Sequence, residues 1–307
     1  MTAQPSSLLA SIQLESFEFT LKDIHSIDLE QLHSLSVSVG WPHRLDDLRF
    51  LLAHGSGFAA VDSIGRVLGS AMSFPMGGDF STIGMVITSP RLQTQGTGRW
   101  LMDHVLENVK GRRLGLNSTR AAKRLYSTMG FTAEATVFQC QGQATLPAAQ
   151  KGQPEALPPS TQLRAITPDD LEEIIALDHL AYRAPRAVLL SQLLPLSKGG
   201  ALIRDNKIIA FSLIRPFGRG YVIGPIVASS DEEAIAVTRP HIASHEGRFL
   251  RIDTREKSVP FAEFIRQSGL ELFDTVTTMS MYGRLLNPDQ ENGKDVKIFG
   301  LVSQTLG

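Results

Sequence analysis

An internal repeat constrains this sequence more than any other feature. Three segments of the first half recur in the second half in the same order: residues 21–32 (LKDIHSIDLEQL) as 163–174 (LRAITPDDLEEI), 83–87 (IGMVI) as 223–227 (IGPIV), and 129–131 (MGF) as 268–270 (SGL). The offset falls from 142 to 139 residues along the chain, and the offset of 142 also places Arg44 on Arg186. A drifting offset indicates a duplicated domain whose copies differ by small loop deletions.

The length agrees with two copies. A chain of 307 residues suffices for two domains of about 150 residues, each with its own core. Residues 141–162 carry four prolines and few large apolar side chains, a composition typical of a linker. We therefore expect one domain over residues 1–143, a Pro/Gln-rich linker over 144–162, and a second domain over 163–307.

Each half has the same predicted order of elements. A strand is followed by one or two helices, a run of strands, a helix, a strand, a helix and a final strand, which places the fold in the α/β or α+β class. Thr167 followed by Pro168 predicts the start of the first helix in the second half, with an acid two residues after the proline. Asp28 with Gln31 predicts a capping box at the matching helix of the first half.

Composition excludes several classes of function. With 30 Lys and Arg against 31 Asp and Glu, the net charge is −1, which argues against nucleic acid or an anionic membrane as partner. Cys140 is the single cysteine, so an intrachain disulfide and a cysteine-based zinc site are both excluded. The sequence shows neither a signal peptide nor an apolar run of about 18 residues, and we expect a cytoplasmic protein.

The histidines do not predict a metal site. His241 and His245 are four residues apart, as metal ligands on a helix are, but the adjacent glutamate of a metalloprotease helix is missing. We expect this pair on the surface face of a helix, and no metal cofactor.

The loop after the apolar strand of residues 82–87 carries the strongest chemical signal. Gly96 and Gly98 precede an amphipathic helix that we expect to begin near Gly98. Glycines let a ligand approach the backbone, and the first N–H groups of a helix attract a phosphate. The loop is neither a P-loop, because no Gly-Lys-Ser/Thr follows, nor a dinucleotide fingerprint, because Leu101 replaces its third glycine.

The pattern Gln93-x-x-Gly96-x-Gly98, with LYSTMGF at residues 125–131 about 28 residues later, resembles the GNAT superfamily of N-acetyltransferases. The whole chain is similar to bacterial tandem forms with a second, degenerate acetyltransferase-like domain. The resemblance implies an α+β fold of two GNAT-like domains, each with a central mixed, mainly antiparallel sheet flanked by helices. It also implies acetyl-CoA as cosubstrate.

The resemblance assigns roles to individual residues. The pyrophosphate would be held by the loop and the first helical turn: Arg91, Gln93, Thr94, Gln95, Gly96, Thr97, Gly98 and Arg99. Met85, Val86 and Ile87 would offer backbone groups to the pantetheine and the thioester. Tyr126 would be the general acid that protonates the departing thiolate. The structural alternative is that Tyr126 is a core aromatic residue.

The second half lacks these features. Residues 229–236 (SSDEEAIA) place three carboxylates where the glycine loop stands in the first half, and carboxylates repel a pyrophosphate. Ile265 replaces Tyr126. We therefore expect that the second domain does not bind CoA and that it shapes the acceptor pocket of the first.

The acceptor side is less clearly marked. Asp79 and His43 are candidates for the general base, although Asp79 equally fits an exposed turn and His43 a connecting loop. Trp41, Asp178 and Asp253 are candidates for substrate binding; for the two aspartates, the alternative is an ion pair with Arg186 or Arg251.

Together these features predict an acetyl-CoA-dependent N-acetyltransferase. Its acceptor would be a small amine or an amino-acid-like molecule that attacks the thioester directly. Two alternatives stay open: a CoA-sensing module without turnover, and an acetyltransferase for protein lysines or N-termini. Nothing in the sequence predicts the oligomeric state.

Overall fold

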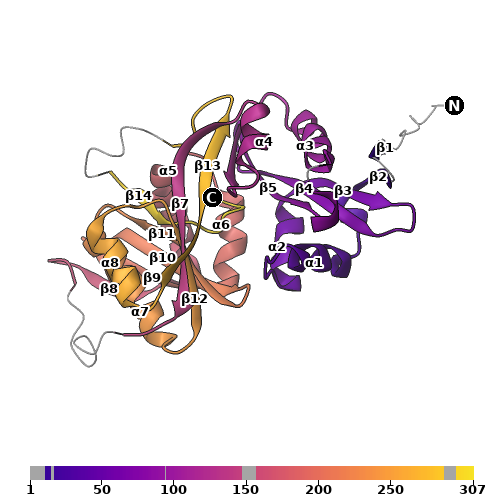
Figure 1. Ribbon diagram of the computed structural model, residues 1–307. Helices are drawn as coiled ribbons and strands as arrows, with labels where there is room; N and C mark the ends of the chain where they lie inside the picture. The colour runs from indigo at the N-terminus through magenta and orange to yellow at the C-terminus, as the bar shows by residue number, and fades with distance from the viewer. Residues whose placement is uncertain (1–10, 15–16, 94, 147–156, 287–294) are drawn as a thin grey trace. The chain divides into compact units, whose positions relative to one another are not determined.

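The computed structural model describes residues 11–14, 17–93, 95–146, 157–286 and 295–307 (Figure 1). The chain forms two compact units. Unit 1 comprises residues 1–75 and 83–110, and unit 2 comprises residues 76–82 and 111–307. Each unit is considered by itself below.

Unit 1 contains one sheet and three α-helices among its described residues. Its elements are β1 (Ser11–Leu14), β2 (Phe17–Asp23), η1 (Ile24–Ser26), α1 (Leu29–Ser38), α2 (Leu45–His54), β3 (Ser56–Asp62), β4 (Val67–Pro75), residues 83–88 of β5 (Phe80–Thr88), η2 (Pro90–Leu92) and α3 (Thr97–Asn108). The strands follow the order β1-β2-β3-β4-β5.

The two faces of this sheet are covered by different helices. In Figure 1, α3 lies on one face and α1 and α2 lie on the other. Alternating residues of β4 serve the two sides: a Cβ at Gly69 would meet Leu101 of α3 at 2.9 Å, whereas Ser70 and Met72 line a cavity with residues of α1 and α2. The period of two along β4 therefore explains the layered arrangement.

Unit 2 contains the remaining elements. They are β6 (Arg113–Ser118), α4 (Lys123–Thr128), β7 (Thr132–Gln143), β8 (Gln162–Ala165), η4 (Pro168–Asp170), α5 (Leu171–Tyr182), α6 (Ala187–Leu193), η5 (Leu194–Leu196), β9 (Lys198–Arg204), β10 (Lys207–Phe217), β11 (Gly220–Ala228), α7 (Asp231–Ser244), β12 (Phe249–Thr254), α8 (Val259–Gln267), β13 (Glu271–Met281) and β14 (Lys297–Gly300). The sheet order is β6-β13-β7-β12-β11-β10-β9-β8, and β14 pairs with β11.

The element order confirms the predicted duplication and the α+β class. From β2 to β7 and from β8 to β13, a strand, two helices, three strands, a helix, a strand, a helix and a strand follow one another. The repeated arginines also occupy equivalent places, because Arg44 is the N-cap of α2 and Arg186 is the N-cap of α6.

The last strand of each copy pairs with strands of the other copy. β13, the last strand of the second copy, lies between β6 and β7 of the first. β7, the last strand of the first copy, lies between β13 and β12 of the second. All these pairs are antiparallel, so β7 and β13 form a ribbon shared by the two copies (Figure 1).

The register of this ribbon is symmetric about one pair of residues. Val137 pairs with Val276, and Val276 is also the residue that corresponds to Val137 in the repeat, at the offset of 139. On either side of it, Phe138 pairs with Thr275 and Thr136 pairs with Thr277. A residue that contacts its own equivalent marks a local two-fold relation, as in an isologous dimer interface. Both valines are buried and pack with Leu301.

The predicted helix starts are confirmed with one correction. Thr167 caps the turn before α5 and forms a capping box with Asp170. Asp28 caps α1 by accepting from the N–H of Glu30. Gln31 does not complete a capping box there, because its Oε1 accepts a hydrogen bond from the N–H of Val67 at 3.0 Å. The glutamine side chain is long enough to reach β4, where its oxygen accepts from a backbone N–H of the strand.

His241 corrects a second prediction. We expected it on a surface, but it is buried in α7, where its Nε2 lies 2.9 Å from the hydroxyl of Ser212. That hydroxyl donates to the carbonyl oxygen of Val237, so the imidazole is the donor in this pair. Burial lowers the pKa of His241 to about 4.

The shared ribbon predicts how the chain behaves when it is expressed as two separate fragments. Residues 1–150 alone lack β13 and residues 151–307 alone lack β7, so each fragment exposes unpaired strands and should aggregate. Coexpressed, the two fragments should copurify through a tag on one of them. Val276→Asp, which buries a charge at the central pair, should reduce this recovery, whereas Phe273→Asp at an exposed position of the same strand should not. Fragments that are separately soluble and monomeric would contradict the shared ribbon.

The buried imidazole predicts a dependence of stability on pH. The folded pKa is about 4 and the unfolded value about 6.5, so the unfolded state binds the extra proton between these values. Stability should be complete above about pH 6.5 and fall toward pH 4, by on the order of 2–3 kcal/mol from this residue. His241→Gln should flatten the slope in denaturant titrations across this range. His179→Gln, at an exposed position of α5, should keep it. If His241→Gln leaves the slope unchanged, the pH dependence of stability comes from other groups.

Candidate functional site

The predicted phosphate loop ends at a helix without a side-chain cap. Gly96 is the N-cap of α3 with φ +91°, a conformation that glycine adopts readily, and its Cβ position would have no atom within 4 Å. The helix begins at Thr97, one residue before the predicted Gly98. No side chain caps the first turn of the helix, and the space beside Gly96 is open. Thr94 lies outside the described residues.

Other polar groups lie in this segment. The hydroxyl of Thr97 is buried without a hydrogen-bond partner in the structure. Arg91 and Gln93 are exposed, and Arg99 lies 3.8 Å from Asp103 one turn later on α3. An open helix terminus with arginines on both sides attracts an anion.

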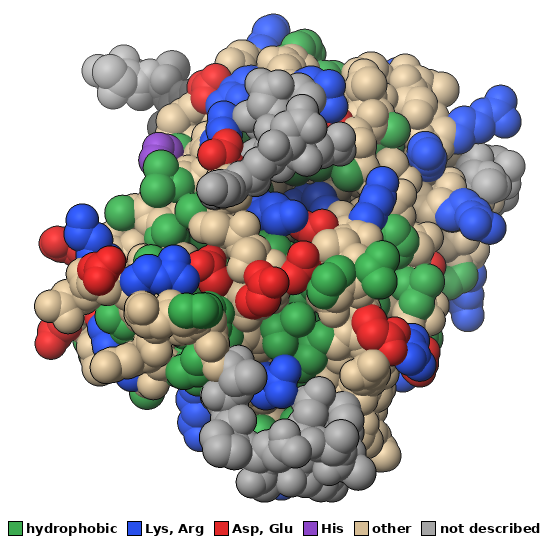
Figure 2. Space-filling model, turned by 90° about the vertical axis from the view of Figure 1, so that its left-hand side faces the viewer, with side chains coloured by type: hydrophobic (Ala, Val, Ile, Leu, Met, Phe, Trp, Pro, Cys, Tyr) green, Lys and Arg blue, Asp and Glu red, His purple; other side chains and the backbone are tan. Residues whose placement is uncertain are grey.

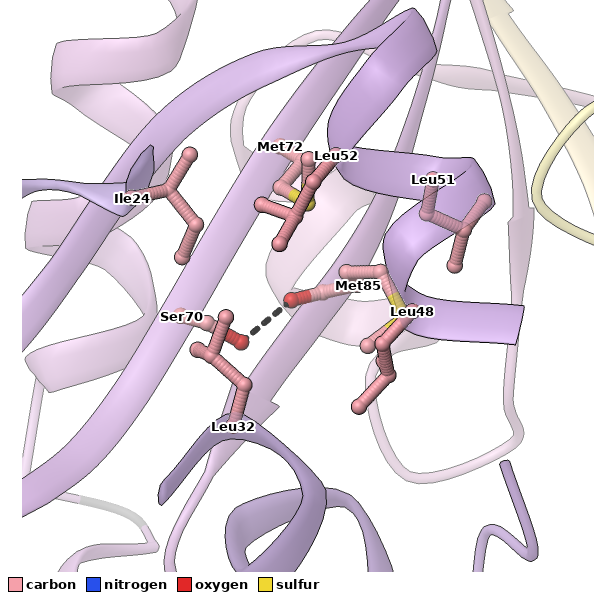
Figure 3. Close-up of a pocket in the computed structure, with 8 residues that line it drawn as sticks. All are labelled: Ile24, Leu32, Leu48, Leu51, Leu52, Ser70, Met72 and Met85. Carbon is pink, nitrogen blue, oxygen red and sulfur yellow. Dashed lines mark hydrogen bonds between the residues drawn. The ribbon is translucent and has the colours of Figure 1, made fainter. Parts of the chain in front are cut away.

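Met85 occupies an unusual backbone conformation within β5. Its φ is +51°, which a residue with a side chain rarely adopts. Its carbonyl oxygen accepts a hydrogen bond from the hydroxyl of Ser70 at 2.7 Å, which holds the distorted strand in place (Figure 3). Strained backbone of this kind concentrates at functional sites. The repeat places Pro225 at the matching position of β11, and proline cannot adopt a positive φ.

A small cavity lies beside this distortion in unit 1. Its walls are apolar apart from Ser70: Ile24, Leu32, Leu48, Leu51, Leu52, Met72 and Met85 point into it (Figure 3). Its volume of about 10 Å³ is at the lower limit for holding one water molecule. The methionine side chains are flexible, so the walls can adjust to a small apolar group.

Tyr126 belongs to unit 2, where it is buried in the short helix α4. Gly130, at φ +97°, ends the helix, and the N–H of Phe131 returns to the carbonyl oxygen of Tyr126 at 3.0 Å. The ring of Phe131 packs edge-on against the phenol with centroids 6.0 Å apart. Burial raises the pKa of Tyr126 well above its usual value, so the phenol keeps its proton at neutral pH.

The second copy keeps this scaffold and loses the hydroxyl. Gly269, at φ +80°, ends α8, and the N–H of Leu270 bonds to the carbonyl oxygen of Ile265 at 3.2 Å. Ile265 is buried at the place of Tyr126. The Gly-Phe and Gly-Leu segments thus recur because a left-handed residue is needed to end the helix.

The helix that matches α3 carries its own carboxylates. Ser230 caps α7 by accepting from the N–H of Glu233, and the carboxylate of Glu233 accepts from the N–H of Ser229 at 3.0 Å. Asp231 accepts from the hydroxyl of Ser258. These acidic groups occupy the terminus where the first copy is open, as the sequence predicts.

The two candidate bases have protein partners. Asp79 forms a two-point ion pair with Arg113, at 3.0 and 3.1 Å, and is largely exposed, as the turn alternative predicts. The hydrogen bonds from Arg113 lower the pKa of Asp79, which makes it a weaker base. In unit 1, Nδ1 of His43 lies 2.8 Å from the hydroxyl of Ser36, and the ring of Trp41 lies edge-on to the imidazole.

The two aspartates form the ion pairs that the sequence left open as alternatives. Asp178 is fully buried and bonds at 2.5 and 3.0 Å to Arg186, which is itself buried. Asp253 is also fully buried and bonds to Arg251 at 2.9 and 3.0 Å. Removing one member of a buried ion pair leaves the charge of the other member buried and unpaired. Both aspartates therefore stabilise the structure of unit 2.

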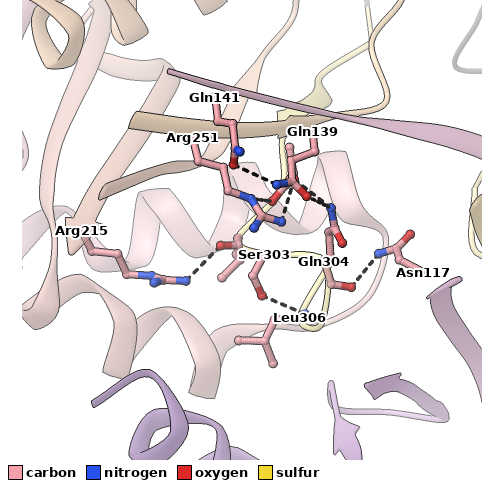
Figure 4. Close-up of polar contacts among 10 residues, drawn as sticks. Asn117, Gln139, Gln141, Arg215, Arg251, Ser303, Gln304 and Leu306 are labelled. Carbon is pink, nitrogen blue, oxygen red and sulfur yellow. Dashed lines mark hydrogen bonds and ion pairs between the residues drawn. The ribbon is translucent and has the colours of Figure 1, made fainter. Parts of the chain in front are cut away.

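Asp253 is also part of a polar network that the sequence analysis missed. Nε2 of Gln304 donates to Asp253 at 3.0 Å and to Gln139 at 3.1 Å, and Nδ2 of Asn117 donates to the carbonyl oxygen of Gln304 at 2.7 Å (Figure 4). The residues come from β12, β7, β6 and the segment after β14, so no sequence spacing links them. The signal for this network that the sequence offers is the presence of polar residues at the ends or in the middle of apolar strands.

Charge and metal-ligating groups are dispersed over the molecule. Acidic and basic side chains are interspersed on the face that Figure 2 shows. Among the described residues, no three His, Cys, Asp or Glu side chains gather as a metal site would require. Within the same residues, every helix is too short or too polar to cross a membrane.

Comparison with known proteins assigns both halves to one family. The model of the acetyltransferase (GNAT) family matches residues 23–131, and a model described as acetyltransferase (GNAT) domain matches residues 174–293. The chain is 24% identical over 288 residues to the uncharacterized N-acetyltransferase YitH of Bacillus subtilis, covering 92% of this chain and 97% of that protein.

Solved structures show the same fold. A putative acetyltransferase from Pyrococcus horikoshii matches 96% of this chain and 98% of its own, with a TM-score of 0.72 and 16% identity. A tandem GNAT protein from the clavulanic acid biosynthesis pathway matches 85% of this chain and 98% of its own, with a TM-score of 0.61 and 14% identity. Because a GNAT model matches each half, the chain carries two GNAT acetyltransferase domains in tandem.

Proposed function

We propose that this protein transfers the acetyl group of acetyl-CoA to the amine of a small, amino-acid-like acceptor. The first domain, residues 1–143, binds acetyl-CoA. The second domain, residues 163–307, is joined by the linker of residues 144–162 and shapes the acceptor pocket without binding CoA.

The contrast between α3 and α7 carries this assignment. The first helix offers an open N-terminus behind Gly96, with a buried hydroxyl of Thr97 that has no partner. The second offers carboxylates of Asp231 and Glu233. A pyrophosphate is attracted by the first terminus and repelled by the second. The positive φ at Met85, absent from the second copy, supports the same division.

The transfer needs no covalent enzyme intermediate. The neutral amine attacks the thioester carbonyl carbon, the new C–N bond forms, the C–S bond breaks, and the sulfur takes a proton. Tyr126 is our candidate donor of that proton, since a phenol is protonated at neutral pH. The amine proton passes to a base or to water. His43 is our candidate base, with Trp41 beside it as a substrate contact, because the ion pair with Arg113 disfavours Asp79.

Gly96→Glu should abolish acetyl-CoA binding. The new carboxylate would stand at the open terminus of α3, where it repels the pyrophosphate. Gly65→Glu is the matched control, because Gly65 has φ +86°, lies in a turn and also has no atom within 4 Å of its Cβ position. Both variants carry a similar backbone cost of about 1–2 kcal/mol. Calorimetric titration with acetyl-CoA should show binding in the control and none in Gly96→Glu; equal affinities would refute the assignment.

Tyr126→Phe should lower kcat by about 100-fold or more and leave acetyl-CoA affinity within a few-fold. Phenylalanine keeps the packing against Phe131 and removes the proton donor. Thiol release with a panel of amines measures the rate. Tyr221→Phe, at a partly exposed position in β11, should keep full activity. An unchanged kcat in Tyr126→Phe would remove this residue from the chemistry.

A further inference from the structure

The strand β14 lies in a fork between two strands of unit 2. The first part of β11 pairs in parallel with β12, at residues 221–222. Its last part, residues 226–228, pairs antiparallel with residues 297–300 of β14. Because β10 pairs with the other edge of β11 along the same residues, β12 and β14 follow one another on a single edge of β11.

The segment also bonds to the other arm of this fork. The N–H of Leu301 donates to the carbonyl oxygen of Asp253, near the end of β12, at 2.8 Å. On the side of β11, a Cβ at Gly224 would clash with the carbonyl oxygen of Leu301, so the segment lies directly against the backbone of that strand. Residues 297–301 therefore satisfy backbone groups that two diverging strands would otherwise leave without partners.

Two large apolar side chains hold the segment in the fork. Phe299 is fully buried in the core of unit 2, and its ring meets that of Phe261 in α8 edge-on, with centroids 5.1 Å apart. Leu301 is fully buried in a separate cluster with Val137 and Val276 of the ribbon. Both side chains would enter water if the segment left, so the filled fork is the stable state.

The repeat shows which groups of β11 the segment covers. At the offset of 140, Ile226 and Val227 correspond to Val86 and Ile87 of the first copy. The family resemblance assigns the backbone of Val86 and Ile87 to the pantetheine arm of CoA. That arm carries amide groups, so it can pair with the edge of a strand as a peptide does. In the second copy, β14 already pairs with this edge.

We propose that residues 297–301 occupy, in the second domain, the place that the pantetheine arm would take, so that a segment of its own chain closes this domain to CoA. The inference rests on the proposed function and adds a steric cause to the electrostatic one. Asp231 and Glu233 lie at the helix terminus where a pyrophosphate would bind, whereas β14 fills the fork between the strands. The two obstacles lie at different places, so removing one of them leaves the other.

The filled fork also serves the first copy. Beyond β14, the carbonyl oxygen of Val302 accepts from Nη2 of Arg215 at 3.0 Å, and the chain enters the network of Figure 4. There the backbone of Gln304 accepts from Asn117 of β6. The segment thus ties β11 and β12 of the second copy to a strand of the first.

The first test removes the charges and leaves the segment in place. Asp231→Asn, Glu232→Gln and Glu233→Gln, combined with Gly96→Glu to remove the first site, should give a full chain that binds no acetyl-CoA in calorimetric titration. The new amides keep the oxygen acceptors of the cap. The same three changes without Gly96→Glu should leave the affinity within about twofold of the wild type, with one acetyl-CoA per chain. Binding by the combined variant, where Gly96→Glu alone shows none, would overturn the inference, because charge alone would then have excluded CoA.

The second test locks the segment in the fork. Ala228 and Lys297 face each other in the ladder, at a Cα separation that a disulfide can span. In a Cys140→Ser background, Ala228→Cys with Lys297→Cys should cross-link on oxidation. The locked chain should bind acetyl-CoA and release thiol as its reduced form does. A lock that abolishes acetyl-CoA binding, or a folded chain that does not cross-link, would refute the inference.

The outcomes separate this inference from the proposed function. If the wild type acetylates amines but a second acetyl-CoA binds once the charges are removed, the inference is wrong and the proposed function stands. If the wild type binds no acetyl-CoA, the proposed function fails, and the disulfide decides whether the segment fills the fork. Thermal unfolding of each variant shows whether a loss of binding reflects a loss of fold, and the locked chain provides the test if the neutralised variant does not fold.

Discussion

The pairing of β7 with β13 is the interaction on which the rest of unit 2 depends. Each strand is the last element of its own copy and lies between strands of the other copy. Residues 138–141 of β7 and residues 277–280 of β13 have antiparallel ladder partners on both sides. The small apolar cluster of Val137, Val276 and Leu301 and the network around Gln304 are both built against this ribbon. Neither copy completes its sheet until both strands are present.

The two copies share their scaffold and differ in their chemistry. Gly130 and Gly269 end equivalent helices with the same backbone hydrogen bond, so the positions that direct the chain are retained. Other positions have diverged: the glycine loop of the first copy corresponds to a carboxylate-rich cap in the second, and Tyr126 corresponds to Ile265. A turn that needs glycine needs it whatever ligand the domain binds, whereas a few changes of charged residues are enough to remove an anion site. The pattern fits our proposal that the second domain keeps its place in the fold without binding CoA.

Much of the fold could be predicted from the sequence, because local rules govern it. Helix caps at Asp28 and Thr167, the order of elements and the glycine before α3 all follow from short-range patterns. Strand neighbours could not be predicted, because a period of two identifies a strand without naming its partners. The positive φ of Met85 gave no signal, since methionine has no preference for it. The role of Gln31 was missed because its partner, Val67, is 36 residues away.

The symmetric register at Val137 and Val276 bears on how such a protein can change over time. A gene that encodes two independent domains can discard one of them once its activity is lost. Here each copy supplies a strand to the sheet of the other and receives a strand in return. Deleting either copy would remove an internal strand from the sheet of its neighbour. The exchange of strands would therefore retain either copy for the sake of the fold even if its ligand site were lost, and the surface of that copy could then acquire a new specificity.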